Sequence, residues 1–141
     1  FGDNEYGQAS IPASVRQECA TQVAAGGAHT LILLASGEVL AFGDNSDGQC
    51  TIPAAALQGR ATQVAAGAAH SLVVLEGGEL VVFGRNSDGE CTLPAAVRGK
   101  RVEQVAGGDS HTLVLLEHGE VVAFGSNKQG QCNIPEEVRG R

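Results

Sequence analysis

Short apolar runs alternate with glycine-rich polar segments along the chain, and its central part shows the pattern well. Residues 62–66 predict a short strand, and Gly67 then allows a turn into a second strand over 71–75. The second run is almost continuously apolar, which indicates burial on both faces. Residues 76–79 read Glu-Gly-Gly-Glu and predict a hairpin turn into a third strand over 80–83.

A fourth, outer strand is expected after this hairpin. Residues 86–89 read Asn-Ser-Asp-Gly, which is typical of a tight turn, and a brief strand is predicted over 90–93. Pro94 ends it, because proline cannot donate to a strand ladder. Each unit is therefore predicted to be an antiparallel sheet of three to four strands.

The unit recurs along the chain. Phe-Gly occurs at 1–2, 42–43, 83–84 and 124–125, so that each step is 41 residues. The repeats are accordingly 1–41, 42–82 and 83–123, with a partial fourth over 124–141. A sheet that is apolar on both faces must stack on neighbours, since burying one leucine contributes about 1.5–3 kcal/mol. Radial stacking of blades of this length is the solution found in propellers. We therefore predict an all-β chain, with one domain over 1–141 that is a β-propeller fragment of about three blades.

The repeat also carries a family resemblance. The motif Val-Ala-Ala-Gly-x-x-His-Thr/Ser-Leu, followed by Gly-Glu-Val-x-x-Phe-Gly-x-Asn-x-x-Gly-Gln, resembles the short-repeat form of the regulator of chromosome condensation superfamily. Phe42, Phe83 and Phe124 stand where many members carry tryptophan. The resemblance implies a propeller that usually has seven blades. We therefore expect a fragment of a longer chain, or a form that needs further blades or self-association to close its ring.

Composition narrows the classes of partner. The formal net charge is −7, which disfavours nucleic acid and favours a protein partner with a basic face. The longest apolar run, 31–35, is far shorter than the roughly 20 residues of a spanning helix, so no membrane insertion is expected. No leader sequence is visible either, which favours an intracellular protein.

Three histidines recur with the repeat, namely His29, His70 and His111. A metal or catalytic ring is one interpretation, because histidine is a common metal ligand and neutral-pH base. Equivalent positions on separate blades rarely converge to the roughly 2.0–2.3 Å that zinc requires. We therefore expect each histidine to tie its own glycine turn to backbone groups, and we expect His118 to be solvated at a hairpin tip.

Four cysteines are present, of which Cys50, Cys91 and Cys132 recur with the repeat while Cys19 stands where other units carry arginine. None forms a Cys-x-x-Cys pair, which disfavours a zinc or redox centre. Equivalent positions on separate blades also seldom approach within the roughly 4.4–6.8 Å of a disulfide. Buried or half-buried free thiols are expected, which favours a reducing intracellular compartment.

Other candidate motifs lack the spacing that their chemistry requires. Residues 44–48 read Asp-Asn-Ser-Asp-Gly like the start of a calcium loop, but position 12 of that loop would be Ala55, so a turn is predicted. The glycine pairs precede no Lys-Ser/Thr, and no catalytic constellation or cofactor site is found. Glu38, Glu79 and Glu120 recur at hairpin turns and are expected to be solvated.

Positions that differ between repeats are the candidates for binding. One set lies at loop tips expected to line one rim of the propeller. Its members are Glu5, Tyr6, Ser46, Asp47, Ser87, Asp88, Lys128 and Gln129. A second set lies on the connections between blades, at 16–20, 57–61 and 98–102. Tolerated surface variation is the alternative interpretation of both sets.

Three functions remain in competition. Rigid sheets with variable loops and no chemistry favour a non-catalytic protein-interaction scaffold or recognition module. The family resemblance implies the same, since members serve as domains of ubiquitin ligases and as inhibitors of a bacterial lactamase. It also implies the first alternative, a guanine nucleotide exchange factor for a small GTPase. The second alternative is a structural subunit of a large assembly.

Overall fold

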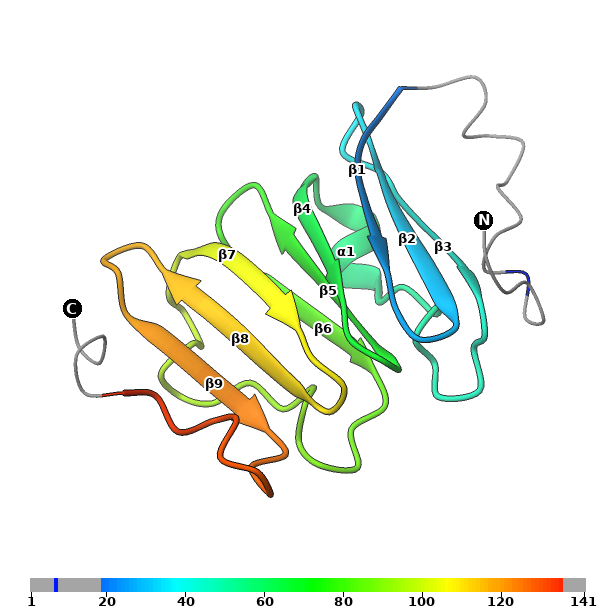
Figure 1. The fold of residues 1–141 in the computed structure, drawn as a ribbon. Coiled ribbons are helices and arrows are strands. Elements are labelled where there is room, and N and C mark those ends of the chain that lie inside the picture. The colour runs from blue at the N-terminus through cyan, green and yellow to red at the C-terminus, as the bar shows by residue number, and fades with distance from the viewer. Residues whose placement is uncertain (1–6, 8–18, 136–141) are drawn as a thin grey trace.

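The computed structural model describes Gly7 and residues 19–135, and within them it consists of three antiparallel sheets. Figure 1 shows the sheets following one another along the chain, from the blue to the orange end. Each sheet has three strands in sequence order. The strands are β1 Ala20–Ala25, β2 His29–Leu34, β3 Val39–Gly43, β4 Ala61–Ala66, β5 His70–Leu75, β6 Leu80–Gly84, β7 Val102–Gly107, β8 His111–Leu116 and β9 Val121–Gly125. We call each sheet, with the loop that follows it, a blade.

The central blade confirms the predicted strands to within a residue at each end. Its middle strand, β5, is buried along its whole length, as the apolar run indicated. The register pairs Val64 with Val73 and Val73 with Val81, so apolar side chains align across the sheet. A bulge between Ala61 and Gln63 recurs at the same place in all three sheets. The three-stranded antiparallel blade and the all-β class are therefore confirmed.

The predicted outer strand over 90–93 is wrong. These residues form turns, closed by the bond from the Thr92 N–H to the Gly89 carbonyl at 3.1 Å. The side chain of Asn86 also accepts the Cys91 N–H and donates to Thr92 Oγ1. Because these local partners satisfy the segment, it does not need to pair with a neighbouring strand.

A short helix, α1 Ala54–Gln58, lies in the first connection between blades and was not predicted. It follows Pro53 and consists mainly of alanine, the best helix former. Its Ala56 is buried between the first two blades. Within the described part of the chain, no helix is long and apolar enough to cross a membrane.

Two hydrophobic clusters join the blades, and they are built from equivalent positions of the repeat. The first places Leu31 and Leu33 of the first blade against Val64 and Val73 of the second. The second places Leu72 and Val74 of the second blade against the third. Leu31 and Leu72 are both 0% exposed, so the predicted burial of the middle strands between neighbouring blades is confirmed.

Candidate functional site

The repeated histidines connect successive blades. The ring Nε2 of His29 lies 2.9 Å from Ser71 Oγ of the next blade, and that hydroxyl donates to the carbonyl of Gln49 at 2.7 Å. His70 repeats the arrangement with Thr112 at 3.0 Å. Because each hydroxyl proton goes to a carbonyl, the histidine Nε2–H must be the donor. We expected each histidine to tie its glycine turn to backbone groups; the structure corrects this expectation for His29 and His70, since the partner of Nε2 is a hydroxyl of the next blade.

The burial of these rings disfavours their charged form. Desolvation lowers the pKa of His29 and of His70, although Glu90 raises that of His70 in part. In both rings Nδ1 is buried without a hydrogen-bond partner. A glycine beside each ring leaves the necessary room, because a Cβ at Gly67 would overlap the ring of His70. These histidines are structural, and His118 is exposed at its hairpin tip as expected.

The loop that follows each sheet has the same internal framework in all three blades. An asparagine side chain accepts the backbone N–H five residues later, at 2.8 Å in every copy. A Gln or Glu side chain accepts a tip N–H two residues before it, at 2.9–3.0 Å. A glycine between them has a positive φ of 78–83°. The asparagines are Asn45, Asn86 and Asn127, the acceptors Gln49, Glu90 and Gln131, and the glycines Gly48, Gly89 and Gly130. The turn predicted at 44–48 is thus confirmed, and its polar side chains hold the loop.

The repeated cysteines belong to this framework as well. The thiols of Cys50, Cys91 and Cys132 lie 3.0–3.3 Å from the carbonyl at the start of their loops. All three are half-buried and unpaired, as predicted, whereas Cys19 is exposed, which corrects the prediction for that residue. Burial raises the pKa of all three and takes that of Cys91 to about 12. Protonated thiols of this kind are poor nucleophiles and metal ligands.

The predicted binding residues that the structure describes lie at the tips of these loops, where the framework does not use their side chains. Ser46, Asp47, Ser87, Lys128 and Gln129 are exposed and Asp88 is half-buried. Glu5 and Tyr6 lie outside the described residues. We call the three loops 44–51, 85–92 and 126–133 the loop rim, since each follows the third strand of its sheet. Its charge changes along the chain, from acidic at Asp47 to basic at Lys128.

A coupled pair within the loop rim was missed in the sequence. In the first loop, the buried Gln49 donates to Asp44 at 3.2 Å. In the second, Arg85 stands at the first position and lies 3.9 Å from Glu90, which is 0% exposed. The carboxylate therefore stands at the first position in one loop and at the buried position in the other; the first pair is a hydrogen bond, and the second is an ion pair without a hydrogen bond. Aligning the repeats at these two positions would have revealed the exchange.

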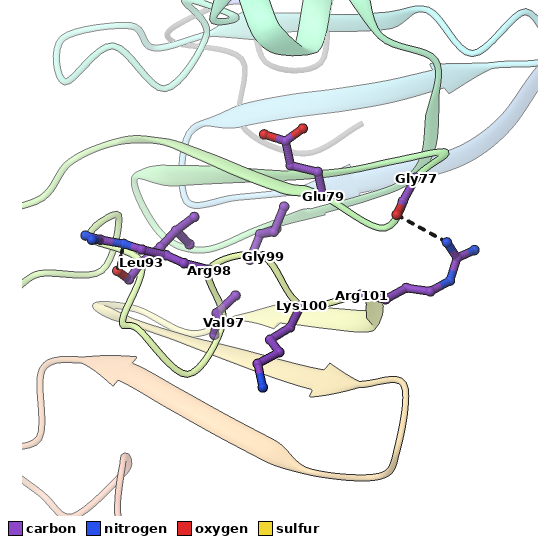
Figure 2. Close-up of a pocket in the computed structure, with 9 residues that line it drawn as sticks. Gly77, Glu79, Leu93, Val97, Arg98, Gly99, Lys100 and Arg101 are labelled. Atoms are coloured by element: carbon purple, nitrogen blue, oxygen red, sulfur yellow. Dashed lines mark hydrogen bonds between the residues drawn. The ribbon is translucent and has the colours of Figure 1, made fainter.

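The second variable set lies at the opposite end of the strands, beside the hairpin turns. Here a pocket of about 490 Å³ separates the turn at Gly77 and Glu79 from the connection into the third blade. Figure 2 shows Arg101 bound to the carbonyl of Gly77 across it, while Lys100 points away from Glu79. Residues 16–18 of this set lie outside the described residues.

Arg101, which lines this pocket, connects two neighbouring blades. Arg60 makes the same contact at the first junction, with bonds of 2.8 and 3.1 Å to the carbonyls of Ser36 and Ala35. At the hairpin turns Glu38 and Glu79 are exposed, as predicted, and Glu120 is half-buried. Among the described residues no three His, Cys, Asp or Glu side chains gather as metal ligands. The exposed tips of the loop rim differ between the three copies.

Comparison with known proteins identifies the repeat. The model described as the regulator of chromosome condensation (RCC1) repeat matches residues 20–49, 61–90 and 102–131. Each match covers one sheet and its loop as far as the Gln or Glu acceptor. No curated protein matches the chain by sequence.

Solved structures of propellers resemble the three blades together. Human WBSCR16 superimposes with a TM-score of 0.72 at 25% identity, over 85% of this chain and 37% of that one. Prp20p from Saccharomyces cerevisiae, described with its binding to Gsp1p and histones, gives 0.69 at 21% identity, over 86% and 34%. The ectodomain of the Physcomitrella patens receptor kinase CR4 gives 0.65 at 18% identity, over 82% and 31%. The chain therefore spans between 31% and 37% of these structures, and the propeller-blade prediction is confirmed.

Proposed function

Because the chain belongs to the regulator of chromosome condensation (RCC1) repeat family, we propose that it is a non-catalytic recognition module that binds a protein partner through its loop rim. The observation that carries the proposal is the contrast within each loop. The hydrogen bonds of the framework are the same in all three copies, whereas the exposed tips differ in size and charge. A rigid frame that displays different side chains is suited to specific binding at little entropic cost.

The charges of the rim favour a basic partner surface at its first two loops. Asp44 and Asp47 lie in the first loop, and Asp88 lies in the second loop, one repeat after Asp47. The hydrogen bond from the Ser46 backbone N–H lowers the pKa of Asp44, which keeps that carboxylate ionised. The net charge of −7 adds a long-range attraction to basic partners. Binding of histones, which are basic proteins, by the structurally similar Prp20p is in keeping with such a partner.

Site-specific photo-crosslinking tests the proposal and identifies the partner. A photoreactive residue placed at position 47 should capture a protein that the same residue at position 79 does not, because the two sites lie at opposite ends of the strands. The captured partner is then titrated against Asp47→Lys combined with Asp88→Lys. Each reversal replaces a surface attraction of about 0.2–1 kcal/mol by a similar repulsion, so we expect a loss of about 1–2 kcal/mol, roughly 5- to 30-fold in Kd.

Glu38→Lys combined with Glu79→Lys is the matched control. It makes the same change in net charge at exposed carboxylates of the hairpin turns, and it should leave the Kd within about twofold. Equal losses from both double variants would show a nonspecific charge effect and contradict the proposal. If the partner is a small GTPase whose labelled nucleotide is released faster with catalytic amounts of the chain, the non-catalytic assignment is wrong.

A further inference from the structure

The pocket beside the second connection between blades combines an apolar lining with basic side chains. Its volume of about 490 Å³ lies within the range of ligand pockets, and all its lining residues lie between Gly77 and Arg101. Leu80 and Val97 in its lining are 4% and 3% exposed, and the half-buried Leu93 packs with them. We call this hollow the basic pocket. Its position between the second and third blades gives it walls from two sheets.

Three basic residues gather at the basic pocket, although the chain has a net charge of −7. Arg101 belongs to the junction, because its bond to the hairpin turn joins two blades. Arg98 and Lys100 have no such role, since the first connection carries Leu57 and Gly59 at the equivalent positions. That connection forms the helix α1, whereas the second forms turns over 95–99. The joining of blades therefore accounts for one of the three charges and not for the other two.

The basic side chains keep donors that the described part of the chain does not use. Arg98 Nε donates to the Leu93 carbonyl at 2.9 Å, and Arg101 Nη1 donates across the pocket at 3.2 Å. Each guanidinium therefore retains two nitrogens, and Lys100 its ammonium, with no partner among the described residues. Figure 2 shows the two arginines extending in opposite directions, on either side of the pocket. Two unused nitrogens of one guanidinium match the two oxygens of a carboxylate.

We propose that the basic pocket binds an acidic segment of a partner protein, with carboxylates on Arg98 and Arg101 and an apolar side chain against Leu80 and Val97. The opposite charge favours carboxylates, and the apolar lining favours a segment that also carries an apolar residue. Glu79 is exposed in the wall, so it repels a ligand charged along its whole length, such as nucleic acid. The basic pocket lies at the opposite end of the strands from the loop rim, so this proposal does not rest on the function proposed above.

NMR titration of the isotope-labelled chain with synthetic peptides tests this binding. The end-blocked peptide Glu-Glu-Leu-Glu-Glu should shift the amide signals of Glu79, Val97 and Lys100 and leave those of Ser46 and Asp47 unchanged. Glu-Glu-Gly-Glu-Glu lacks the apolar side chain and should bind roughly fivefold more weakly. Lys-Lys-Leu-Lys-Lys should not shift the pocket signals. If inorganic phosphate at the same concentration shifts them as much as the acidic peptide does, the pocket is a simple anion site and the proposal is wrong.

Charge reversal at one residue separates the pocket from the net charge of the chain. Arg98→Glu should weaken binding of Glu-Glu-Leu-Glu-Glu by roughly fivefold or more. Lys128→Glu makes the same change in net charge at the loop rim and should leave the affinity within about twofold. The same spectra show whether each variant is folded, and Arg98→Leu, which introduces the residue of the first connection, is used if Arg98→Glu is not. Equal losses from the variants at 98 and 128, or shifts confined to the loop rim, overturn the proposal.

Discussion

The hydroxyl of Thr112 connects the second and third blades, and removing it measures how much one polar bridge contributes to the junction. Thr112 and His70 are both 0% exposed, and the hydroxyl accepts from His70 Nε2 and donates to the Glu90 carbonyl at 2.9 Å. Thr112→Val keeps the shape of the side chain but removes both bonds. The two buried groups left without a partner cost about 1–3 kcal/mol each, and the added methyl offsets about 1 kcal/mol. We expect the free energy of unfolding to fall by about 3 kcal/mol.

Urea unfolding monitored by far-UV circular dichroism gives this free energy by linear extrapolation. Thr62→Val is the matched control, because Thr62 is exposed and water can replace its 3.3 Å bond to the Val74 carbonyl. The control should change the free energy of unfolding by less than about 0.5 kcal/mol. If both substitutions have the same effect, the reasoning about buried bridges between blades is refuted.

Three further predictions use the same unfolding assay. Because burial lowers the pKa of His70 below its ordinary value of 6.5, the unfolded chain binds the proton first. Stability is therefore full above about pH 6.5 and declines as the pH falls toward the lowered pKa, and His70→Gln should flatten that decline. Arg85→Asp places a second carboxylate beside the buried Glu90 and should lower the free energy of unfolding by about 1–3 kcal/mol. Adding Glu90→Gln should restore it, and a double variant no more stable than Arg85→Asp alone would contradict the coupling between positions 85 and 90. Gly78→Ala should cost about 1–3 kcal/mol, because φ there is 88° and a Cβ would meet the adjacent arginine, whereas Gly77→Ala in open space should be near neutral.

Periodicity was enough to predict the sheets. The 41-residue step and the apolar runs located the strands of the central blade, because alternating burial and tight turns leave strong local signals. The outer strand at 90–93 was predicted from turn composition and a terminal proline, which do not reveal that the Asn86 side chain binds that backbone itself. The helix after Pro53 had a local signal in its alanines, which the all-β pattern outweighed.

Contacts between blades could be predicted less well than those within them. The fixed spacing showed that the histidines are equivalent. It did not show that His29 lies beside a residue of the next repeat, because that depends on how one sheet stacks on another. The exposure of Cys19 and of Val23 has the same origin, since both lie where the other blades meet a preceding blade.

The loops separate the residues that fix a shape from those that display chemistry. Asn45 and Gly48 hold the backbone of the first loop, so Ser46 and Asp47 can change without altering it. The pair Asp44 with Gln49 in the first loop is Arg85 with Glu90 in the second, so even a buried position of the loop varies between copies. A change at the loop tips therefore costs little stability, whereas a change at a junction disturbs two sheets at once. Because the loop tips and the junctions use different residues, we expect substitutions at the tips to alter the proposed partner binding without disturbing the joining of blades.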